Sequence, residues 1–226
     1  MKKKLVVLSG AGISAESGIK TFRDMGGLWE EYDITEVASP HAWQTNRKLV
    51  LQFYNKRRKQ LLQVKPNKAH LLLAKLEEKF DIHIITQNVD DLHERAGSSQ
   101  VLHLHGELKK VRSTIDENLI YTLDGWELKE TDLCEKGAPL RPHIVWFGED
   151  VPMIEEAIKI TQTADIFLVI GTSLNVYPAA GLLNYVPKNK ATFLIDPNEI
   201  STYHNITTIK EKASIGMQKF IEILQE

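Results

Sequence analysis

The feature that most constrains the fold lies at the start of the chain, where a short apolar run breaks into glycines. Residues 5–8 are aliphatic on both faces, which is typical of a strand buried in a parallel sheet. The pattern G-x-G-x-x-A follows at Gly10, Gly12 and Ala15. Here the first glycine permits the tight turn, the second lets the backbone approach a pyrophosphate, and the small third residue lets helix pack on strand. We expect free amides at the helix start to face the anion.

The continuation of this stretch differs from that of a standard dehydrogenase. A dinucleotide unit usually carries an acidic residue about 20 positions on, at the end of a second strand. Glu31 and Asp33 lie near that distance, but no strand-like run precedes them. The pattern therefore indicates either a plain tight turn of an α/β protein or a nucleotide site of another kind.

Composition excludes several classes of protein. The 226 residues are 42% hydrophobic and 26% charged, as in ordinary soluble globular proteins. A formal net charge of −2 provides no basic field for nucleic acid. The apolar run near the start is too short for a signal peptide, and no segment approaches a membrane span. The single cysteine, Cys134, excludes an intrachain disulfide and a thiolate zinc cluster. We expect a monomeric, cytoplasmic protein that binds neither nucleic acid nor membrane.

Apolar runs separated by helical segments predict an α/β fold with a parallel sheet covered on both faces. The clearest strands are expected at 5–8, 81–86, 164–171 and 191–196, with a short one at 101–106. Helices are expected at 46–62, 66–80 and 217–224, and no strand between 26 and 80. Residues 107–143 hold only short β-like pieces, and we interpret them as a small irregular module inserted into the main domain.

Ligands of open parallel sheets bind at the carboxyl ends of the strands. Those ends carry glycines, hydroxyls, amides or carboxylates, in the groups Gly10-Ala11-Gly12, Gln87-Asn88-Val89-Asp90, Gly171-Thr172-Ser173 and Asp196. Turn formation could explain Asp196, and helix capping could explain Ser173 or one of Asn88 and Asp90. Neither explains the whole set, so four such ends together indicate a nucleotide site.

Two further pairs of residues could carry chemistry. His103 and His105 alternate on one strand and share a face, so they could bind a metal, or one could act as a base. A structural histidine is the ordinary explanation for either, but Gly106 leaves backbone room beside His105 and favours it. Tyr54 and Arg57 lie three apart on a predicted helix and could hold a small carboxylate. The surrounding KRRK run could equally be a solvated helix face.

The assembled motifs resemble the sirtuins, the NAD-dependent protein-lysine deacylases, and are most similar to the bacterial CobB-type members. They are GAGISAESGIKTFRD, TQNVDDLHERAG, HLHGEL, RPHIVWFGE and GTSLNVYPAAG, in this order, over nearly the whole chain. The resemblance implies one catalytic domain with a Rossmann-like parallel sheet and a smaller inserted helical plus irregular module, with NAD in the cleft between. The sheet part would comprise about 1–25, 81–106 and 144–226, and the module about 26–80 and 107–143.

The resemblance also implies which residues contact the ligands. NAD, consumed as a co-substrate, would be held by Gly10, Ala11, Gly12, Ile13, Ala15, Thr21, Phe22, Arg23, Trp29, Gln87, Asn88, Val89, Asp90, Gly171, Thr172, Ser173, Asp196, Pro197, Asn198 and Ala213. Val145, Phe147 and Gly148 would border an acyl-lysine tunnel. Backbone groups of Gly148, Glu149 and Val176 would pair with the substrate peptide as an added strand.

The mechanism implied by the resemblance transfers the acyl group to NAD. The acyl oxygen of the modified lysine attacks C1′ of the nicotinamide ribose, and nicotinamide leaves. Asn88 and Asp90 would line the nicotinamide pocket, with Asp90 holding the carboxamide, and His105 would act as general base on a ribose hydroxyl. The products would be nicotinamide, free lysine and O-acyl-ADP-ribose.

Two features refine the resemblance. Tyr54 and Arg57 match the Y-x-x-R pattern of sirtuins that remove succinyl and malonyl groups, so we expect desuccinylation alongside deacetylation. Most sirtuins also bind a structural zinc through two cysteine pairs, whereas this chain has only Cys134 in that region. Ser113 stands about where a first-pair cysteine is expected. We therefore expect no zinc, and a module held by packing around Tyr121, Leu123 and Trp126.

Other functions would use parts of the same pattern. An NAD glycohydrolase or mono-ADP-ribosyltransferase would share the nicotinamide pocket, but RPHIVWFGE and NVYPAA favour deacylation. A non-catalytic NAD-binding module is disfavoured by His105, Asn88 and Asp90. The balanced charge disfavours a nucleic-acid binder.

Overall fold

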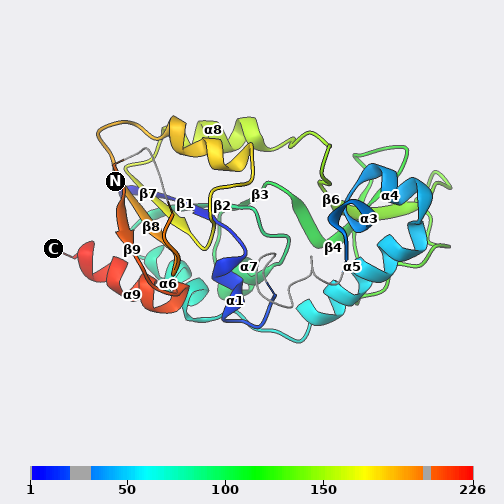
Figure 1. Cartoon of the computed structure of the whole chain (residues 1–226), viewed down its shortest axis with the longest axis horizontal. Coiled ribbons are helices and arrows are strands. Elements are labelled where there is room, and N and C mark those ends of the chain that lie inside the picture. The colour runs from blue at the N-terminus through cyan, green and yellow to red at the C-terminus, as the bar shows by residue number, and fades with distance from the viewer. Residues whose placement is uncertain (1, 21–31, 201–204, 226) are drawn as a thin grey trace.

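Two sheets organise the molecule, which is described here from a computed structural model covering residues 2–20, 32–200 and 205–225. The larger sheet has six parallel strands in the order β3-β2-β1-β7-β8-β9. They are β1 (Lys4–Ser9), β2 (Asp81–Thr86), β3 (Val101–His103), β7 (Ile166–Ile170), β8 (Ala191–Ile195) and β9 (Thr207–Ile209). Figure 1 shows this sheet at one end of an elongated molecule, with both termini, and the smaller sheet towards the other end.

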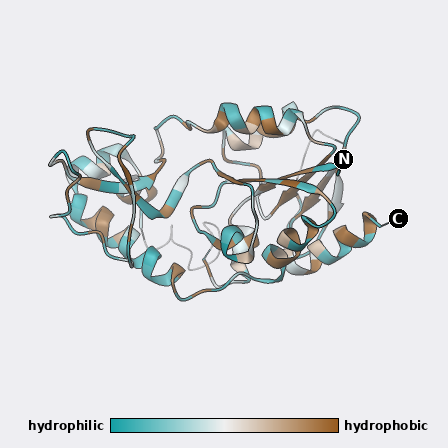
Figure 2. Cartoon of the chain, turned by 180° about the vertical axis from the view of Figure 1, so that it is seen from behind, coloured by the Kyte–Doolittle hydropathy of each residue, from teal (hydrophilic) through white to brown (hydrophobic). Residues whose placement is uncertain are grey.

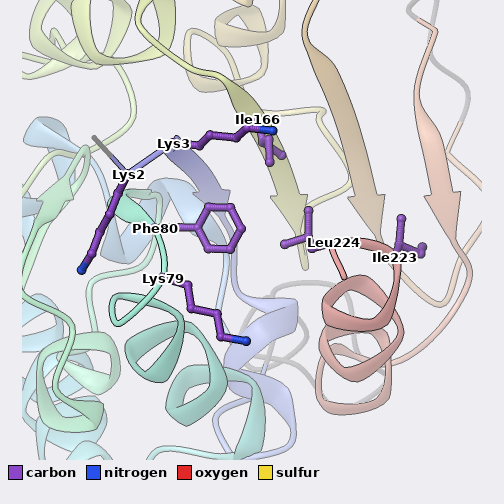
Figure 3. A pocket seen from close by; sticks show the side chains of 7 residues that line it. All are labelled: Lys2, Lys3, Lys79, Phe80, Ile166, Ile223 and Leu224. Atoms are coloured by element: carbon purple, nitrogen blue, oxygen red, sulfur yellow. The ribbon is translucent and has the colours of Figure 1, made fainter. Parts of the chain in front are cut away.

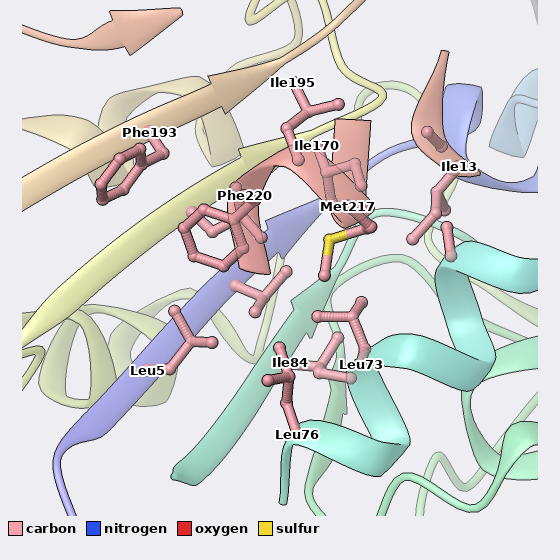
Figure 4. Close-up of a cluster of buried hydrophobic side chains, with 14 of the residues drawn as sticks. Leu5, Ile13, Leu73, Leu76, Ile84, Ile170, Phe193, Ile195, Met217 and Phe220 are labelled. Carbon is pink, nitrogen blue, oxygen red and sulfur yellow. The ribbon is translucent and has the colours of Figure 1, made fainter. Parts of the chain in front are cut away.

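Helices cover both faces of the larger sheet, because its strands are apolar on both sides. From β1, Leu5 and Val7 join one buried cluster with α6 (Lys68–Leu76) and α9 (Ala213–Ile223). Figure 4 shows this cluster, with Phe220 and Met217 lying over the strands. Val6 and Leu8 join a second cluster with α8 (Ile154–Gln162) and the 3-10 helix η1 (Ala179–Tyr185). The predicted α/β fold with a covered parallel sheet is confirmed.

The smaller sheet is antiparallel, with the order β5-β4-β6. Its strands are β4 (Gly106–Ser113), β5 (Ile120–Thr122) and β6 (Leu140–Ile144). The region expected to be irregular with short β-like pieces thus forms a three-stranded sheet, in which the pairing of β4 with β6 shifts register between Gly106 and Val111. The helices beside it are α3 (Ile34–Val37), α4 (Pro40–Thr45) and α5 (Arg47–Leu61). Asn46 caps α5 by accepting a hydrogen bond from the Leu49 amide at 3.2 Å. The buried face of α5, which includes Phe53 and Tyr54, then packs against this part of the molecule.

Several details differ from the expectation drawn from the sequence. Helix α6 does not belong with the smaller module, because Leu73 and Leu76 pack in the cluster on the larger sheet. Strand β9 and helix α8 were not predicted: β9 has only three residues, and no side chain caps α8. Among the described residues, no helix is long and apolar enough to cross a membrane. Figure 2 shows the larger sheet as mainly hydrophobic strands flanked by helices of mixed hydropathy.

Packing in the smaller module is only partly as expected. Tyr121 and Leu123 lie against a buried cluster at the smaller sheet. The members of that cluster are Leu51, Val111, Leu128, Cys134, Ala138 and Leu140. Trp126 is not part of it, being 37% exposed with the Lys59 ammonium 5.3 Å from its ring centroid. This cluster is therefore mainly aliphatic, and its residues come from α5, the smaller sheet and the loop between β5 and β6.

Candidate active site

The strand order reverses direction at β1 and β7, since β2 and β3 lie on one side of β1 and β7, β8 and β9 on the other. In parallel sheets this is the point where ligands bind. At this point two backbones touch. A Cβ added at Gly10 would lie 2.6 Å from Cβ of Thr172, and one at Gly171 only 2.2 Å from the Ile13 nitrogen. Gly171 also has φ of +65°, which favours glycine. Glycines are therefore needed here, and they leave bare backbone at the ligand-binding edge.

The same turn offers fewer free amides than expected. The amides of Gly12, Ile13 and Ser14 donate to the carbonyl oxygens of Gly171, Gly10 and Ala11, at 2.8, 3.1 and 3.0 Å. Helix α1 (Gly12–Ala15) is a single turn, and Ala15 is exposed, so its small size is not needed for packing on a strand. The expectation of free helix-start amides is wrong for these three groups, because the turn and the facing Gly171 carbonyl accept their hydrogen bonds. The turn therefore contributes to a site through its backbone shape and not through these three amides.

A compact polar cluster lies beside this junction. The Ser14 hydroxyl donates to Oδ2 of Asp90 at 3.0 Å, and Asn88 Nδ2 lies 3.3 Å from the same hydroxyl oxygen. Asn88 Nδ2 also donates to the Gly10 carbonyl at 3.2 Å. Both Asn88 and Asp90 are only 7% exposed. Ser14 was not singled out from the sequence, although a hydroxyl inside the glycine turn is a signal that could have found it.

The next strand end joins the same cluster from the side of β2. Gln87 Nε2 donates to Oγ1 of Thr172 at 3.1 Å, so the loops after β2 and β7 are linked directly. Val89 is half-buried, and its carbonyl accepts from the Leu108 amide at 2.7 Å. The structure therefore brings together three of the four strand ends predicted to form a site.

Electrostatics set Asp90 apart from the other carboxylates. Burial raises its pKa, and hydrogen bonds from the Leu92 amide and the Ser14 hydroxyl oppose that shift only in part. Arg57 of α5 is half-buried, and burial lowers its pKa, while the charges of Tyr54 and Asp90 act in the opposite direction. The charge of Asp90 thus acts on the Arg57 guanidinium.

The two histidines after β2 have different environments. His103 Nδ1 lies 2.9 Å from the Asn88 carbonyl and Nε2 lies 2.7 Å from Oε1 of Glu94. Both partners are acceptors, so both ring nitrogens carry protons. Burial disfavours the charged ring, but Glu94 outweighs it and raises the pKa of His103. His103 is therefore a structural cation with no free nitrogen.

His105 keeps one nitrogen available. Its Nδ1 lies 3.0 Å from the Gln87 carbonyl, which can only accept, so Nδ1 carries the proton and Nε2 has the lone pair. Within the part of the chain that the structure describes, Nε2 has no hydrogen-bond partner. Burial lowers the pKa of His105, which keeps the ring neutral at pH 7. Gly106 is needed for a different reason than expected: it has φ of +83°, and a Cβ there would lie 2.1 Å from the His143 carbonyl oxygen.

The fourth strand end fits a turn as well as a ligand site. Oδ1 of Asp196 accepts from the Asn198 amide at 2.8 Å and from its side chain at 3.2 Å, which is an Asx turn. Pro197 and Asn198 are exposed, and Ala213 is buried at the first position of α9. Ser173 is half-buried and does not cap η1, whose first turn has no side-chain cap.

A second group of predicted residues surrounds Tyr54. This side chain is 1% exposed, and its hydroxyl oxygen accepts a hydrogen bond of 3.0 Å from Nε1 of Trp146. Burial raises the pKa of Tyr54 to about 12, so the phenol keeps its proton. Arg57 lies one turn further along α5, with its guanidinium 5.5 Å from the Phe53 ring centroid. Tyr54 and Arg57 are thus partly or fully buried, unlike a solvated helix face.

The segment after β6 is bonded to His105 and contains exposed residues. The Val145 amide donates to the His105 carbonyl at 3.0 Å, which ties this segment to the catalytic candidate. Phe147 is 54% exposed, and Gly148 is exposed with φ of +90°. Val176, after β7, is 40% exposed. The Arg141 guanidinium holds Glu149 by donating to its Oε1 at 2.7 Å and to its Oε2 at 3.0 Å.

Four predicted NAD contacts and the possible metal site remain to be placed. Thr21, Phe22, Arg23 and Trp29 lie outside the described residues. Across residues 2–20, 32–200 and 205–225, no group of three or more histidine, cysteine, aspartate or glutamate side chains is placed to hold a metal ion.

Comparison with known proteins agrees with this geometry. Residues 10–178 match the Sir2 family. The chain belongs to this family. It is 54% identical to a protein of Bacteroides thetaiotaomicron named NAD-dependent protein deacylase, over 98% of each chain. It superposes on a Sir2 homologue in complex with ADP-ribose with a TM-score of 0.91 and 39% identity, covering 99% of this chain and 92% of the other. For a Sir2 homologue in complex with NAD the TM-score is 0.88 at 39% identity, over 99% and 90% of the two chains.

One hollow in this Sir2-family chain lies away from the polar cluster. It has a volume of about 830 Å³ and is lined by Lys2, Lys3, Lys79, Phe80, Ile166, Ile223 and Leu224, as Figure 3 shows. Lys3, Phe80 and Ile166 lie at or just before the starts of β1, β2 and β7. The hollow is therefore at the amino ends of the strands, opposite the edge where ligands of parallel sheets bind.

A buried pair of histidines is linked to the site by hydrogen bonds. The rings of His70 and His93 lie 4.9 Å apart between centroids, and each is at most 1% exposed. His93 Nε2 lies 2.9 Å from the Ser9 hydroxyl, which donates to Thr86 Oγ1 at 2.9 Å. Burial lowers the pKa of His70 to about 4 and that of His93 well below its usual value. Both rings are neutral in the folded protein at pH 7.

We expect this pair to destabilise the fold in acid. As the pH falls below 6.5, a histidine of the unfolded chain binds a proton while buried His70 does not, so stability decreases until the pH reaches about 4. At about 1.4 kcal/mol per pKa unit, His70 alone accounts for about 3 kcal/mol. In His70→Gln the amide oxygen can still accept from the Asn67 amide at the start of α6, but it cannot titrate. Urea unfolding at pH 7, 5.5 and 4.5 should give the variant a shallower pH dependence, whereas parallel curves would contradict the assignment.

Proposed function

We propose that this chain is an NAD-dependent protein-lysine deacylase, which transfers the acyl group of a modified lysine to ADP-ribose and releases nicotinamide. The observation that carries the proposal is the meeting, at one sheet edge, of the glycine junction, the Ser14–Asn88–Asp90 cluster and His105 with a free nitrogen. Similarity over nearly the full length to a protein named as such a deacylase supports it.

The residues present fit NAD. A Cβ at Gly10, Gly12 or Gly171 would lie within 3 Å of the facing loop, so glycines let the two backbones meet. The edge without side chains that they leave suits a diphosphate. Asn88 and Asp90 offer amide and carboxyl groups for the nicotinamide carboxamide. When bound, NAD supplies a ribose carbon that accepts the acyl oxygen, with nicotinamide as the leaving group. The protein has to orient that carboxamide and keep water away, and the low exposure of both side chains serves this.

His105 is suited to act as the base. Its Nδ1–H is fixed on the Gln87 carbonyl, which holds the ring and directs Nε2 elsewhere. Because burial lowers its pKa, the neutral form that can accept a proton predominates at pH 7. A proton taken from a ribose hydroxyl at Nε2 would convert the ring to an imidazolium that still donates to Gln87. His103 cannot play this part, because both of its nitrogens are engaged.

Removal of the base should stop turnover while leaving the cofactor site intact. We expect His105→Ala to lose about 10²-fold to 10⁴-fold in kcat, the usual size of general base catalysis. NAD affinity, measured by calorimetry, should change little. His83→Gln is a matched control, because His83 lies in β2 and contacts Asp81 at the start of that strand. Undiminished turnover of His105→Ala would exclude the assignment.

The acyl group is the second part of the proposal, and we infer that it can end in a carboxylate. The Tyr54 oxygen accepts from Trp146, so the phenol proton remains to be donated. Arg57 supplies a guanidinium that can fork onto a carboxylate and lies within electrostatic reach of Asp90. Lys56 and Lys59 of the same basic run are exposed and fit the solvated face. Succinyl and malonyl groups therefore suit this pocket.

Loss of the guanidinium should change acyl preference. In Arg57→Met the side chain keeps much of its length but loses its charge, so we expect kcat/KM for a succinyl-lysine peptide to fall at least about tenfold relative to the matched acetyl-lysine peptide. Lys56→Met removes a neighbouring exposed charge and serves as control. Equal losses with both peptides would refute the carboxylate pocket.

We further infer that the smaller module needs no structural zinc. Cys134 is buried in the aliphatic cluster, and a hydrogen bond with Ser113 lowers its pKa. Lys136 and Asp116 form an ion pair of 2.7 Å nearby in sequence. Elemental analysis of purified protein should find well under one zinc per chain, and EDTA should leave the melting temperature unchanged. Stoichiometric zinc would overturn this inference.

The alternative activities separate by their products. A glycohydrolase would release nicotinamide and ADP-ribose at the same rate with or without an acylated peptide. A mono-ADP-ribosyltransferase would add mass to the protein acceptor. Mass spectrometry of reactions with NAD and acetyl-, succinyl- or longer acyl-lysine peptides should instead show deacylated peptide and O-acyl-ADP-ribose in equal amounts.

A further inference from the structure

The hydrogen bond between Trp146 and Tyr54 joins two distant parts of the chain inside the molecule. The indole Nε1 donates to the phenol oxygen at 3.0 Å, and the two residues are 2% and 1% exposed. Tyr54 belongs to α5, whereas Trp146 follows β6. A phenol hydrogen stays near the ring plane and has two favoured directions. A donor fixed on one side of the oxygen leaves the opposite direction for the proton, so the indole decides where the hydroxyl points.

The indole is itself held from several sides. The Arg141 guanidinium carbon lies 3.5 Å from the Trp146 ring centroid, which is a close cation–π stack. Oε2 of Glu149 accepts a hydrogen bond of 2.8 Å from the Trp146 amide. Arg141 donates to both carboxylate oxygens of Glu149, at 2.7 Å and 3.0 Å. Ring and backbone of Trp146 are thus fixed by the same ion pair.

We propose that Trp146 is a positioning residue that aims the Tyr54 hydroxyl and so contributes to the preference for acyl groups ending in a carboxylate. This inference rests on the proposed deacylase function and its Tyr54–Arg57 pocket. A hydroxyl aimed in advance loses little freedom when it donates to a carboxylate. An acetyl group has no such acceptor, so it gains nothing from the arrangement. Trp146 therefore acts on selectivity, through binding of the acyl group.

A second tryptophan provides a matched control. Trp43 lies beside Trp146, with ring centroids 5.8 Å apart, and packs against the same cluster. Its ring faces Arg47, whose guanidinium carbon is 4.7 Å from the centroid. In the described residues Trp43 makes no hydrogen bond with Tyr54. Trp43→Phe removes the same indole group from the same cluster but leaves the Trp146–Tyr54 bond in place.

The experiment compares Trp146→Phe, Trp43→Phe and the wild-type enzyme on succinyl-lysine and acetyl-lysine forms of one peptide, at saturating NAD. We expect Trp146→Phe to lower the succinyl-to-acetyl ratio of kcat/KM by about threefold to tenfold, the range of one hydrogen bond. The loss should lie in KM for the succinyl peptide. Trp43→Phe should keep the wild-type ratio. In a Tyr54→Phe background, Trp146→Phe should have no further effect on the ratio, because the group that it aims is absent.

Contrary results separate the positioning role of Trp146 from the carboxylate pocket. If Trp146→Phe lowers both activities equally, or still changes the ratio without the Tyr54 hydroxyl, the positioning role is wrong. If Arg57→Met lowers the ratio and Trp146→Phe does not, the inference fails while the proposed function stands. If neither variant changes the ratio, the carboxylate pocket fails with it. Should Trp146→Phe not fold, Arg141→Lys, which keeps the charge but loses the fork on Glu149, should lower the ratio in the same direction.

Discussion

The close contact between the backbones that follow β1 and β7 is the constraint on which the rest of the site depends. Gly12 donates to the Gly171 carbonyl at 2.8 Å, and Gly10 donates to the Ile170 carbonyl at 3.0 Å. Any side chain at Gly171 would meet the Ile13 nitrogen. With the two strand ends joined in this way, the Ser14 hydroxyl lies within hydrogen-bond distance of Asn88 and Asp90. The same backbone contact therefore determines both the shape of the glycine junction and the position of the polar cluster beside it.

Three successive carbonyls connect that edge to β3 and to the start of the smaller sheet. The carbonyls of Gln87, Asn88 and Val89 accept from His105 Nδ1, His103 Nδ1 and the Leu108 amide, at 3.0, 2.9 and 2.7 Å. The side chains of the same loop meanwhile face Thr172, Gly10 and Ser14. One short loop thus positions the base with its backbone and the polar cluster with its side chains. A shift of this loop would move both together, which couples the two halves of the proposed chemistry.

The sheet could be predicted because long aliphatic runs bounded by turns have few alternatives to a buried strand. The strand-end residues could be predicted because parallel strands end at one edge. The sequence did not predict how local groups are consumed. The amides of Gly12, Ile13 and Ser14 are used by the facing Gly171 carbonyl and by the turn, and Oδ1 of Asp196 is used by Asn198. Such bonds depend on backbone angles that residue types do not determine. The short β-like pieces of the smaller module were recognised, but their pairing into a sheet was not. Strand β5 is only three residues long, and its residues are half-buried or exposed, so no apolar pattern indicates a buried sheet face.

The buried polar groups around the site carry a physical cost that the fold has to offset. Asn88, Asp90, Ser9 and Thr86 are at most 7% exposed, and each is hydrogen-bonded. Burial without partners would be far more expensive than burial in this network. The apolar clusters on both faces of the sheet supply the compensating stability, since they lie directly under these strand ends. In return the site groups are fixed before any ligand arrives, so less reorganisation is needed when charge develops during the reaction. A solvated version of the same residues would be cheaper to fold and poorer at catalysis.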